Sequence, residues 1–150
     1  MQLSSNVAGR IVALDLGEVR TGVAISDEGR VISRPLKVVQ SAGLESYLEA
    51  LLRDEGVAEV LVGVPKTLGG DIGFQARRVL DKLHDLKDRF PEVKFVEWDE
   101  RHTTRMVSAG RGRAARGGRR KGRGGKSSER VDHLAAAQML QEYLESGRGI

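Results

Sequence analysis

The segment that decides the fold is Ile11-Val12-Ala13-Leu14-Asp15-Leu16-Gly17, an apolar run with one carboxylate near its end. A short apolar run that stops at Gly17-Glu18 is typical of a buried strand followed by a turn, so we expect a core strand over 11–16. Asp15 has no cation next to it in sequence. A carboxylate at the end of a core element is costly to bury unless something binds it. Asp15 is therefore a candidate ligand-binding residue.

Turn signals and apolar periodicity predict the other elements. The first three strands have short connections and form an antiparallel meander, with Pro35 marking an edge or a bulge. The alternation of strands and helices that follows predicts an α/β fold: a five-stranded mixed sheet, three antiparallel strands and then parallel ones, flanked by helices. We expect the further strands over 21–26, 31–39, 60–64 and 93–98, and helices from Leu44 to a stop at Gly56, from Phe74 to Phe90, and from an N-cap at Ser127 or Ser128 to about Glu145.

Two more carboxylates fall where a ligand site of such a sheet would lie. Glu100 comes just after the 93–98 strand. Asp132 lies on a face of the last helix that is otherwise apolar and continues with Ala135, Ala136, Met139 and Tyr143. Sheets of this kind bind ligands at the carboxyl ends of their parallel strands. We therefore expect Asp15, Glu100 and Asp132 to converge.

Three converging carboxylates predict a divalent-metal site. They cannot all stay ionised within a few ångströms without a counter-charge, which Mg²⁺ or Mn²⁺ would supply. Two such ions about 3.5–4 Å apart activate a water and stabilise the leaving oxygen of a phosphodiester. Asp15 would bridge both ions, while Glu100 and Asp132 would each hold one. Asp99 is the alternative to Glu100, because alternation along a strand sends only one of two neighbours inward.

Each acid alone also has a structural explanation. Asp15 could form the turn before Gly17, and Asp132 could sit favourably in the first turn of its helix. The combination of both with Glu100 at a third core end favours the metal site. The chain has no Cys and no Ser-His arrangement, which agrees with a reaction that needs no side-chain nucleophile.

The positive charge is concentrated in one segment. Residues 110–126 hold six Arg and two Lys without an acid, so the rest of the chain carries −4 against a net charge of +4. The segment also holds seven Gly and no apolar residue larger than Ala, so we expect a mobile Arg/Gly-rich loop. Flexible cations beside an acidic site suit a nucleic acid, and a solubilising surface loop is the alternative. The candidate nucleic-acid-binding residues are Arg111, Arg113, Arg116, Arg119, Arg120, Lys121, Arg123 and Lys126.

Three further cations lie near expected strand ends. Arg20, Lys66 and Arg101 are candidates for phosphate contacts, with a solvated surface role as an equal alternative. His102 and His133 are expected to be structural residues rather than metal ligands.

Length and composition limit the class of protein. At 150 residues the chain is expected to form a single domain over 1–150. The lack of cysteine excludes disulfides, thiolate zinc sites and a cysteine nucleophile. The first ten residues show no signal peptide, and the apolar runs are too short to span a bilayer. We therefore expect a cytoplasmic protein without a membrane partner.

Four spaced motifs cover nearly the whole chain, roughly residues 10 to 144. They are Ala13-Leu14-Asp15-Leu16-Gly17 with Arg20-Thr21-Gly22-Val23-Ala24-Ile25-Ser26-Asp27, then Val62-Gly63-Val64-Pro65 with Gly70 and Gln75-Ala76, then Asp99-Glu100-Arg101-His102-Thr103-Thr104, and finally Val131-Asp132-His133-Leu134-Ala135-Ala136. In this order they resemble the YqgF family, also called RuvX, of Holliday-junction resolvases and pre-16S rRNA processing nucleases. The resemblance implies an RNase H-like fold, with Asp15, Glu100 and Asp132 as the catalytic acids. Two departures are His102, where the family has an aliphatic residue, and the Arg and Gly content of 110–126.

The leading hypothesis is a Mg²⁺- or Mn²⁺-dependent nuclease that leaves 5′-phosphate ends and matures the 5′ end of 16S rRNA, a substrate implied by the resemblance. The second is a resolvase of four-way DNA junctions, whose two symmetric nicks require a two-fold dimer. A monomer and a homodimer both stay open. The third is a catalytically idle nucleic-acid-binding protein. An actin-like ATPase or sugar kinase, which shares Asp-Leu-Gly and Thr-Gly, is disfavoured because it needs two lobes.

Overall fold

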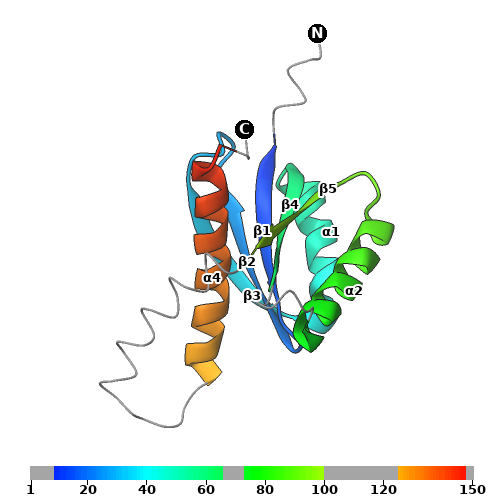
Figure 1. Cartoon of the computed structure of the whole chain (residues 1–150). Helices are drawn as coiled ribbons and strands as arrows, with labels where there is room; N and C mark the ends of the chain where they lie inside the picture. The colour runs from blue at the N-terminus through cyan, green and yellow to red at the C-terminus, as the bar shows by residue number, and fades with distance from the viewer. Residues whose placement is uncertain (1–8, 66–72, 100–124, 148–150) are drawn as a thin grey trace, which may run out of the picture.

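The computed structural model describes residues 9–65, 73–99 and 125–147, and for 125–132 it describes the backbone alone. The five strands form one sheet in the order β3-β2-β1-β4-β5 (Figure 1). β1 is antiparallel to β2, as β2 is to β3, whereas β1, β4 and β5 are parallel. This confirms the predicted mixed sheet. The elements are β1 (Arg10–Leu16), β2 (Arg20–Ser26), β3 (Ser33–Gln40), the short 3₁₀ helix η2 (Ser41–Gly43), α1 (Leu44–Asp54), β4 (Val57–Val64), α2 (Phe74–Arg89), β5 (Lys94–Asp99) and α4 (Gly125–Glu145).

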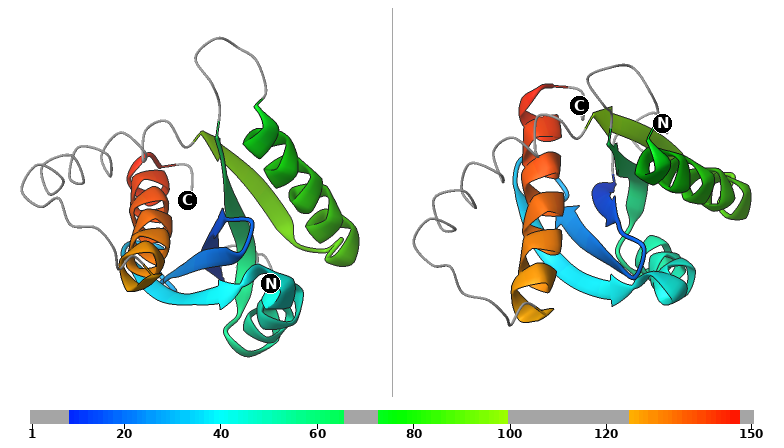
Figure 2. Two further views of the ribbon diagram at one scale, coloured as in Figure 1. Left: turned by 90° about the horizontal axis from the view of Figure 1, so that it is seen from below. Right: turned by 60° about the horizontal axis from the view of Figure 1, so that its bottom comes forward.

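The sheet lies between two helical layers. α4 covers one face, and α1 and α2 cover the other (Figure 2). Side chains of a strand alternate between the faces, so β1 contributes to both cores. Ile11 and Ala13 pack in the cluster on the α4 side, whereas Val12 and Leu14 pack in the cluster with α1 and α2. The continuous apolar run in the sequence reflects this burial on both faces.

Small side chains line the contact between α4 and the sheet. Ala13 of β1, Ala24 of β2 and Ala136 of α4 belong to one cluster and are fully buried. Met139 and Leu140 of α4 fill the remaining space in the same cluster. Because alanine extends little beyond the backbone, the helix and the sheet can approach closely, and a larger residue at any of these positions would be overpacked.

A buried hydrogen bond fixes the last part of α4. The hydroxyl of Tyr143 donates to Oε2 of Glu59 at 2.5 Å, and neither residue is more than 4% exposed. Nη1 of Arg30 lies 3.5 Å from Oε1 of the same carboxylate. The ring of Trp98 meets the ring of Tyr143 edge-on, with 5.6 Å between the centroids. A buried carboxylate needs such partners, so this contact sets which residue of α4 lies over β4.

The edge strand β3 holds α4 from the other side. The hydroxyl of Ser33 donates to the carbonyl of Ala137 at 2.7 Å. The side-chain amide of Gln141 accepts from the backbone N–H of Ser33 at 2.9 Å and donates to the carbonyl of Val31 at 3.2 Å. Together with the Tyr143 hydroxyl, these bonds fix both the rotation and the longitudinal position of α4 on the sheet.

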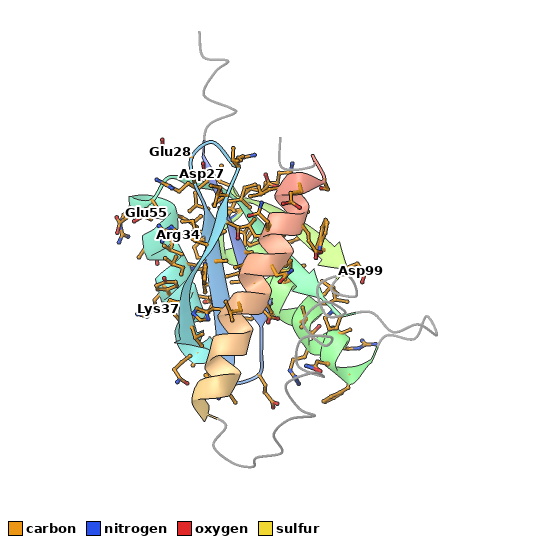
Figure 3. All side chains as sticks on the ribbon, turned by 90° about the vertical axis from the view of Figure 1, so that its left-hand side faces the viewer. Asp27, Glu28, Arg34, Lys37, Glu55 and Asp99 are labelled. Carbon is orange, nitrogen blue, oxygen red and sulfur yellow. The ribbon has the colours of Figure 1, made fainter. Side chains whose placement is uncertain are left out.

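The third strand begins two residues later than predicted. Oδ1 of Asp27 accepts hydrogen bonds from the backbone N–H groups of Val31 and Ile32, at 2.8 and 2.9 Å. These bonds hold both residues in the β2–β3 turn, where Figure 3 labels Asp27, and they lower the pKa of its carboxyl group. Pro35 behaves as predicted: β3 is an edge strand, and its pairing with β2 shifts register beside Pro35.

Two other boundaries also differ. β4 begins at Val57 rather than at residue 60, because Val57 pairs with Arg10 of β1. α4 begins at Gly125, so neither Ser127 nor Ser128 is the N-cap that the sequence suggested. Serine is only mildly unfavourable inside a helix, and the basic and acidic neighbours of these serines are good helix formers.

The Tyr143 hydroxyl should contribute measurably to stability. In Tyr143→Phe the ring still packs, but a buried carboxylate loses its shortest hydrogen bond, so we expect a loss of about 2 kcal/mol in the free energy of unfolding. Urea denaturation measures this, with Tyr47→Phe as the control. Tyr47 is half-buried, and its ring faces Lys37 without a hydroxyl bond among the described residues. Equal losses in the two variants would contradict the anchoring role of Tyr143.

Candidate active site

Asp15 lies on the face of the sheet that α4 covers. It is the penultimate residue of β1, half-buried, and follows Ile11 and Ala13 on the same side of the strand. On β2 it is paired with Gly22. The predicted position of Asp15 at the carboxyl end of a core strand is therefore confirmed, and the structure adds the face to which it belongs.

A glycine of the neighbouring parallel strand lies beside Asp15. Leu14 pairs with Val62 of β4. Because the two strands are parallel, Asp15, the next residue of β1, lies beside Gly63, the next residue of β4. Gly63 in turn pairs with Trp98 of β5. A glycine between Asp15 and the large indole leaves backbone without a side chain at the centre of this row. This row lies at the carboxyl edge of the parallel strands, where sheets of this kind bind ligands.

Alternation along β5 places Asp99 on the other face of the sheet from Asp15. Val96 and Trp98 pack in the cluster on the α4 side, whereas Phe95 packs against the core on the α1 and α2 side. Alternation therefore assigns Asp99, the last residue of β5 and labelled in Figure 3, to the face opposite Asp15. Glu100 lies outside the described residues.

The stripe of α4 that packs on the sheet begins, among the described side chains, at helical spacing from position 132. Ala136, Met139 and Tyr143 follow it at four, seven and eleven residues, and all three are buried. α4 runs in the direction opposite to β1, so its first turns lie toward the carboxyl end of β1 (Figure 1). The backbone thus places position 132 toward the Asp15 edge, while its side chain is outside the description.

Arg20 shares the face of Asp15. On β2, Val23 and Ile25 pack with α1 and α2, so alternation places Arg20 on the α4 side, one step beyond Gly22. The turn that returns the chain to this position requires Gly17, because a Cβ there would stand 2.3 Å from the carbonyl oxygen of Arg20. A cation is thereby held near the acid at the same edge.

The other predicted nucleic-acid contacts lie outside the described residues or side chains. They are Lys66, Arg101, Arg111, Arg113, Arg116, Arg119, Arg120, Lys121, Arg123 and Lys126. Within the described parts, no three His, Cys, Asp or Glu residues are grouped so as to hold a metal ion. That finding does not include the side chains of Glu100 and Asp132.

Sequence reasoning missed a cavity on the opposite face of the same edge. It has a volume of about 310 Å³ and is lined by β1, the β1–β2 turn, η2 and α2, with the cations Arg78 and Lys82 on one wall. A four-residue spacing of Phe74, Arg78 and Lys82 along the helix was the available signal.

Similar proteins align with more than nine tenths of this chain. A protein of Rubrobacter xylanophilus named "Putative pre-16S rRNA nuclease" is 61% identical over 141 residues, covering 94% of this chain and 96% of that protein. One of Desulforudis audaxviator with the same name is 39% identical, over 91% and 94% of the two chains. The structure of Thermus thermophilus RuvC with a Holliday junction substrate has a TM-score of 0.52 at 18% identity, covering 92% of this chain and 96% of that one. The last likeness confirms the RNase H-like fold.

The motifs also match at the level of the family. A family model described as "RuvX: Holliday junction resolvase" matches residues 9–146, which include every motif used above. With Asp15 on the α4 face, the described geometry agrees with the order and spacing of those motifs. The chain therefore belongs to the RuvX family.

Proposed function

We propose that this protein is a divalent-metal-dependent nuclease that hydrolyses a phosphodiester bond in the precursor of 16S rRNA. The observation that carries the proposal is the position of Asp15. It lies at the carboxyl edge of the parallel strands, beside Gly63 and on the face of the sheet that α4 covers. The names of the 61% and 39% identical relatives support the rRNA substrate.

The chemistry of the donors fits magnesium or manganese. Carboxylate oxygens are the ligands that these hard cations prefer. Asp15, Glu100 and Asp132 would hold the metal, with Asp15 shared if two ions bind. The bound metal would supply activation of the attacking water and stabilisation of the leaving oxygen.

The residues of the chain have separate tasks around this metal. Gly63 has no side chain of its own, so a phosphate could approach the backbone next to Asp15 there. Arg20, on the same face, is placed to pair with a non-bridging or neighbouring phosphate oxygen, because a guanidinium matches phosphate geometry. Asp99, on the other face, takes no part in holding the metal.

The second candidate is resolution of four-way DNA junctions. The description of the family and the shared fold with RuvC favour it. Two symmetric nicks would require a two-fold dimer, so this candidate predicts a homodimer in solution whereas rRNA trimming does not. In either case the partner is a nucleic acid. In the described residues, no helix is long and apolar enough to cross a membrane, and we propose a cytoplasmic location, where rRNA precursors are found.

Asp15→Asn should abolish cleavage without unfolding the protein. The amide keeps the shape but loses the charge that holds the metal, so we expect at least about a 10²-fold loss of rate, since even indirect partners of metal ligands cost 10–100-fold. The assay compares precursor rRNA with a four-way junction in Mn²⁺, and the faster substrate decides between the two candidates. Glu92→Gln, an exposed acid before β5, is the control. Cleavage by Asp15→Asn at the wild-type rate would refute the proposed site.

The neighbours Asp99 and Glu100 provide a matched pair of variants. Glu100→Gln should lower the cleavage rate about as strongly as Asp15→Asn, because it removes a metal ligand. The cleavage rate of Asp99→Asn should stay within a few-fold of the wild-type rate, because the Asp99 side chain lies on the opposite face of the sheet. The same Mn²⁺ assay measures both. A reversed order of the two effects would show that the strand alternation breaks before residue 100.

The cations of 110–126 are proposed to contact phosphates. Replacing Arg119, Arg120 and Lys121 with Gln should reduce the slope of log affinity against log salt concentration by about 0.7 for each lost contact with a single strand. Fluorescence anisotropy with labelled RNA measures the slope. A slope equal to that of wild type would indicate that the segment is only a solubilising loop.

A further inference from the structure

The cavity on the α1 and α2 side has the size and walls of a small ligand site. Its volume of about 310 Å³ lies at the lower end of the range for ligand pockets. Leu16 and Val79 supply apolar walls, and Arg78 and Lys82 supply positive charge. Apolar walls with cations at one side suit a ligand that is flat and apolar in one part and anionic in another, as a nucleotide is.

The two cations are held only loosely by protein acids. Nη1 of Arg78 lies 3.9 Å from Glu18, whose side chain is 73% exposed. Nζ of Lys82 lies 3.4 Å from Glu45, which is 38% exposed. Both pairs are only partly buried, so water still screens and weakens them. A phosphate entering the cavity could therefore replace these carboxylates without leaving a buried acid unpaired.

The hydroxyl groups of the cavity shape it rather than bind an anion. The hydroxyl of Ser41 donates to the carbonyl of Gly17 at 2.8 Å, since a carbonyl can only accept. The Thr21 hydroxyl, 2.9 Å from Ser41 Oγ, must then donate to it. Both protons are committed within the protein, and they hold the β1–β2 turn against η2. Arg78 and Lys82 are left as the side-chain donors that face an anion in this cavity.

An exposed aromatic ring continues the line of cations along α2. Phe74, Arg78 and Lys82 follow at intervals of four residues, so they share one face of the helix. Phe74 is 83% exposed, and the guanidinium carbon of Arg78 lies 5.8 Å from its ring centroid. An exposed ring beside cations is the combination on which single-stranded nucleic acids stack their bases and place their phosphates.

The cavity adjoins the candidate active site across the edge of the sheet. Leu16 lines the cavity, and the preceding residue, Asp15, faces the other side. A nucleic acid that touches both places must turn around the end of β1. A duplex, with a persistence length of about 50 nm, cannot make that turn, whereas an unpaired strand can. A nucleic acid that contacts both surfaces would therefore have to be unpaired at this point.

We propose that the Phe74–Arg78–Lys82 face of α2 and its cavity bind an unpaired strand of the substrate next to the bond that is cut. This inference rests on the proposed nuclease function and specifies its substrate: a nucleic acid with a single-stranded flank at the scissile phosphate. Arg78 and Lys82 contact phosphates, Phe74 stacks on a base, and the apolar wall of the cavity accommodates a further base or sugar.

The test compares two double variants in strand binding. Arg78→Ala with Lys82→Ala should reduce the salt slope for a short fluorescent oligoribonucleotide by about 1.4, at 0.7 for each cation. Arg53→Ala with Lys87→Ala removes the same charge from exposed positions away from the cavity and should leave the slope unchanged. Anisotropy titrations in EDTA avoid cleavage. Equal slopes for the two double variants would overturn the proposal.

A second variant tests the aromatic contact without changing charge. Phe74→Ala should weaken binding of the same strand by roughly 5- to 100-fold, the range expected for one lost base stack, with the salt slope unchanged. Phe74→Tyr should restore binding, and a blunt duplex should bind all variants alike. If Phe74→Ala binds the strand with wild-type affinity, the Phe74 ring is not part of the binding surface.

The outcomes separate this inference from the function on which it rests. If wild-type protein cuts precursor rRNA or a junction but the Arg78 and Lys82 double variant binds strands like its control, only the inference is wrong. If wild-type protein cuts neither substrate while that double variant loses strand binding, the surface stands and the nuclease function is wrong.

Discussion

The packing of α4 on the sheet is the constraint on which the candidate site depends. Ala13, Ala24 and Ala136 let the helix lie close to the strands, and the buried bond from Tyr143 to Glu59 fixes its position along them. Asp132 precedes Tyr143 by eleven residues, or about 17 Å of helix. The hydrogen bond of Tyr143 therefore fixes the backbone position of residue 132 from three helical turns away. A shift of one residue in this packing would rotate every position of α4 by about 100° relative to the sheet.

Much of the fold could be predicted because its signals are local. The 11–16 run, the meander turns and the helical stripes each identify their element, and Asp15 was recognised by its place in the first of them. The face on which Asp99 lies could not be predicted from sequence, because it depends on which side of β5 packs against α4. The strand start at Ser33 was missed because the bonds of the Asp27 carboxylate decide it. The cavity was missed because α2 and η2 meet there only in three dimensions.

Consecutive residues of β1 connect the two functional proposals. Asp15 faces the α4 side, where a metal would meet the scissile phosphate, and Leu16 faces the cavity that receives the neighbouring strand. The turn at Gly17 separates the two and is held by the hydroxyls of Thr21 and Ser41. A nucleic-acid strand that contacts both surfaces would pass over this turn. The fold thus relates the place of cleavage to an unpaired segment of the substrate.

The most direct test of the central claim is the position of a bound divalent ion. Crystals of the full chain grown with Mn²⁺ would reveal it by anomalous diffraction. The account predicts a peak on the α4 side of the sheet, within coordination distance of Asp15, Glu100 and Asp132, and no peak at Asp99. A peak at Asp99 on the α1 and α2 side, or a Mn²⁺ ion bound without Asp15, would contradict it.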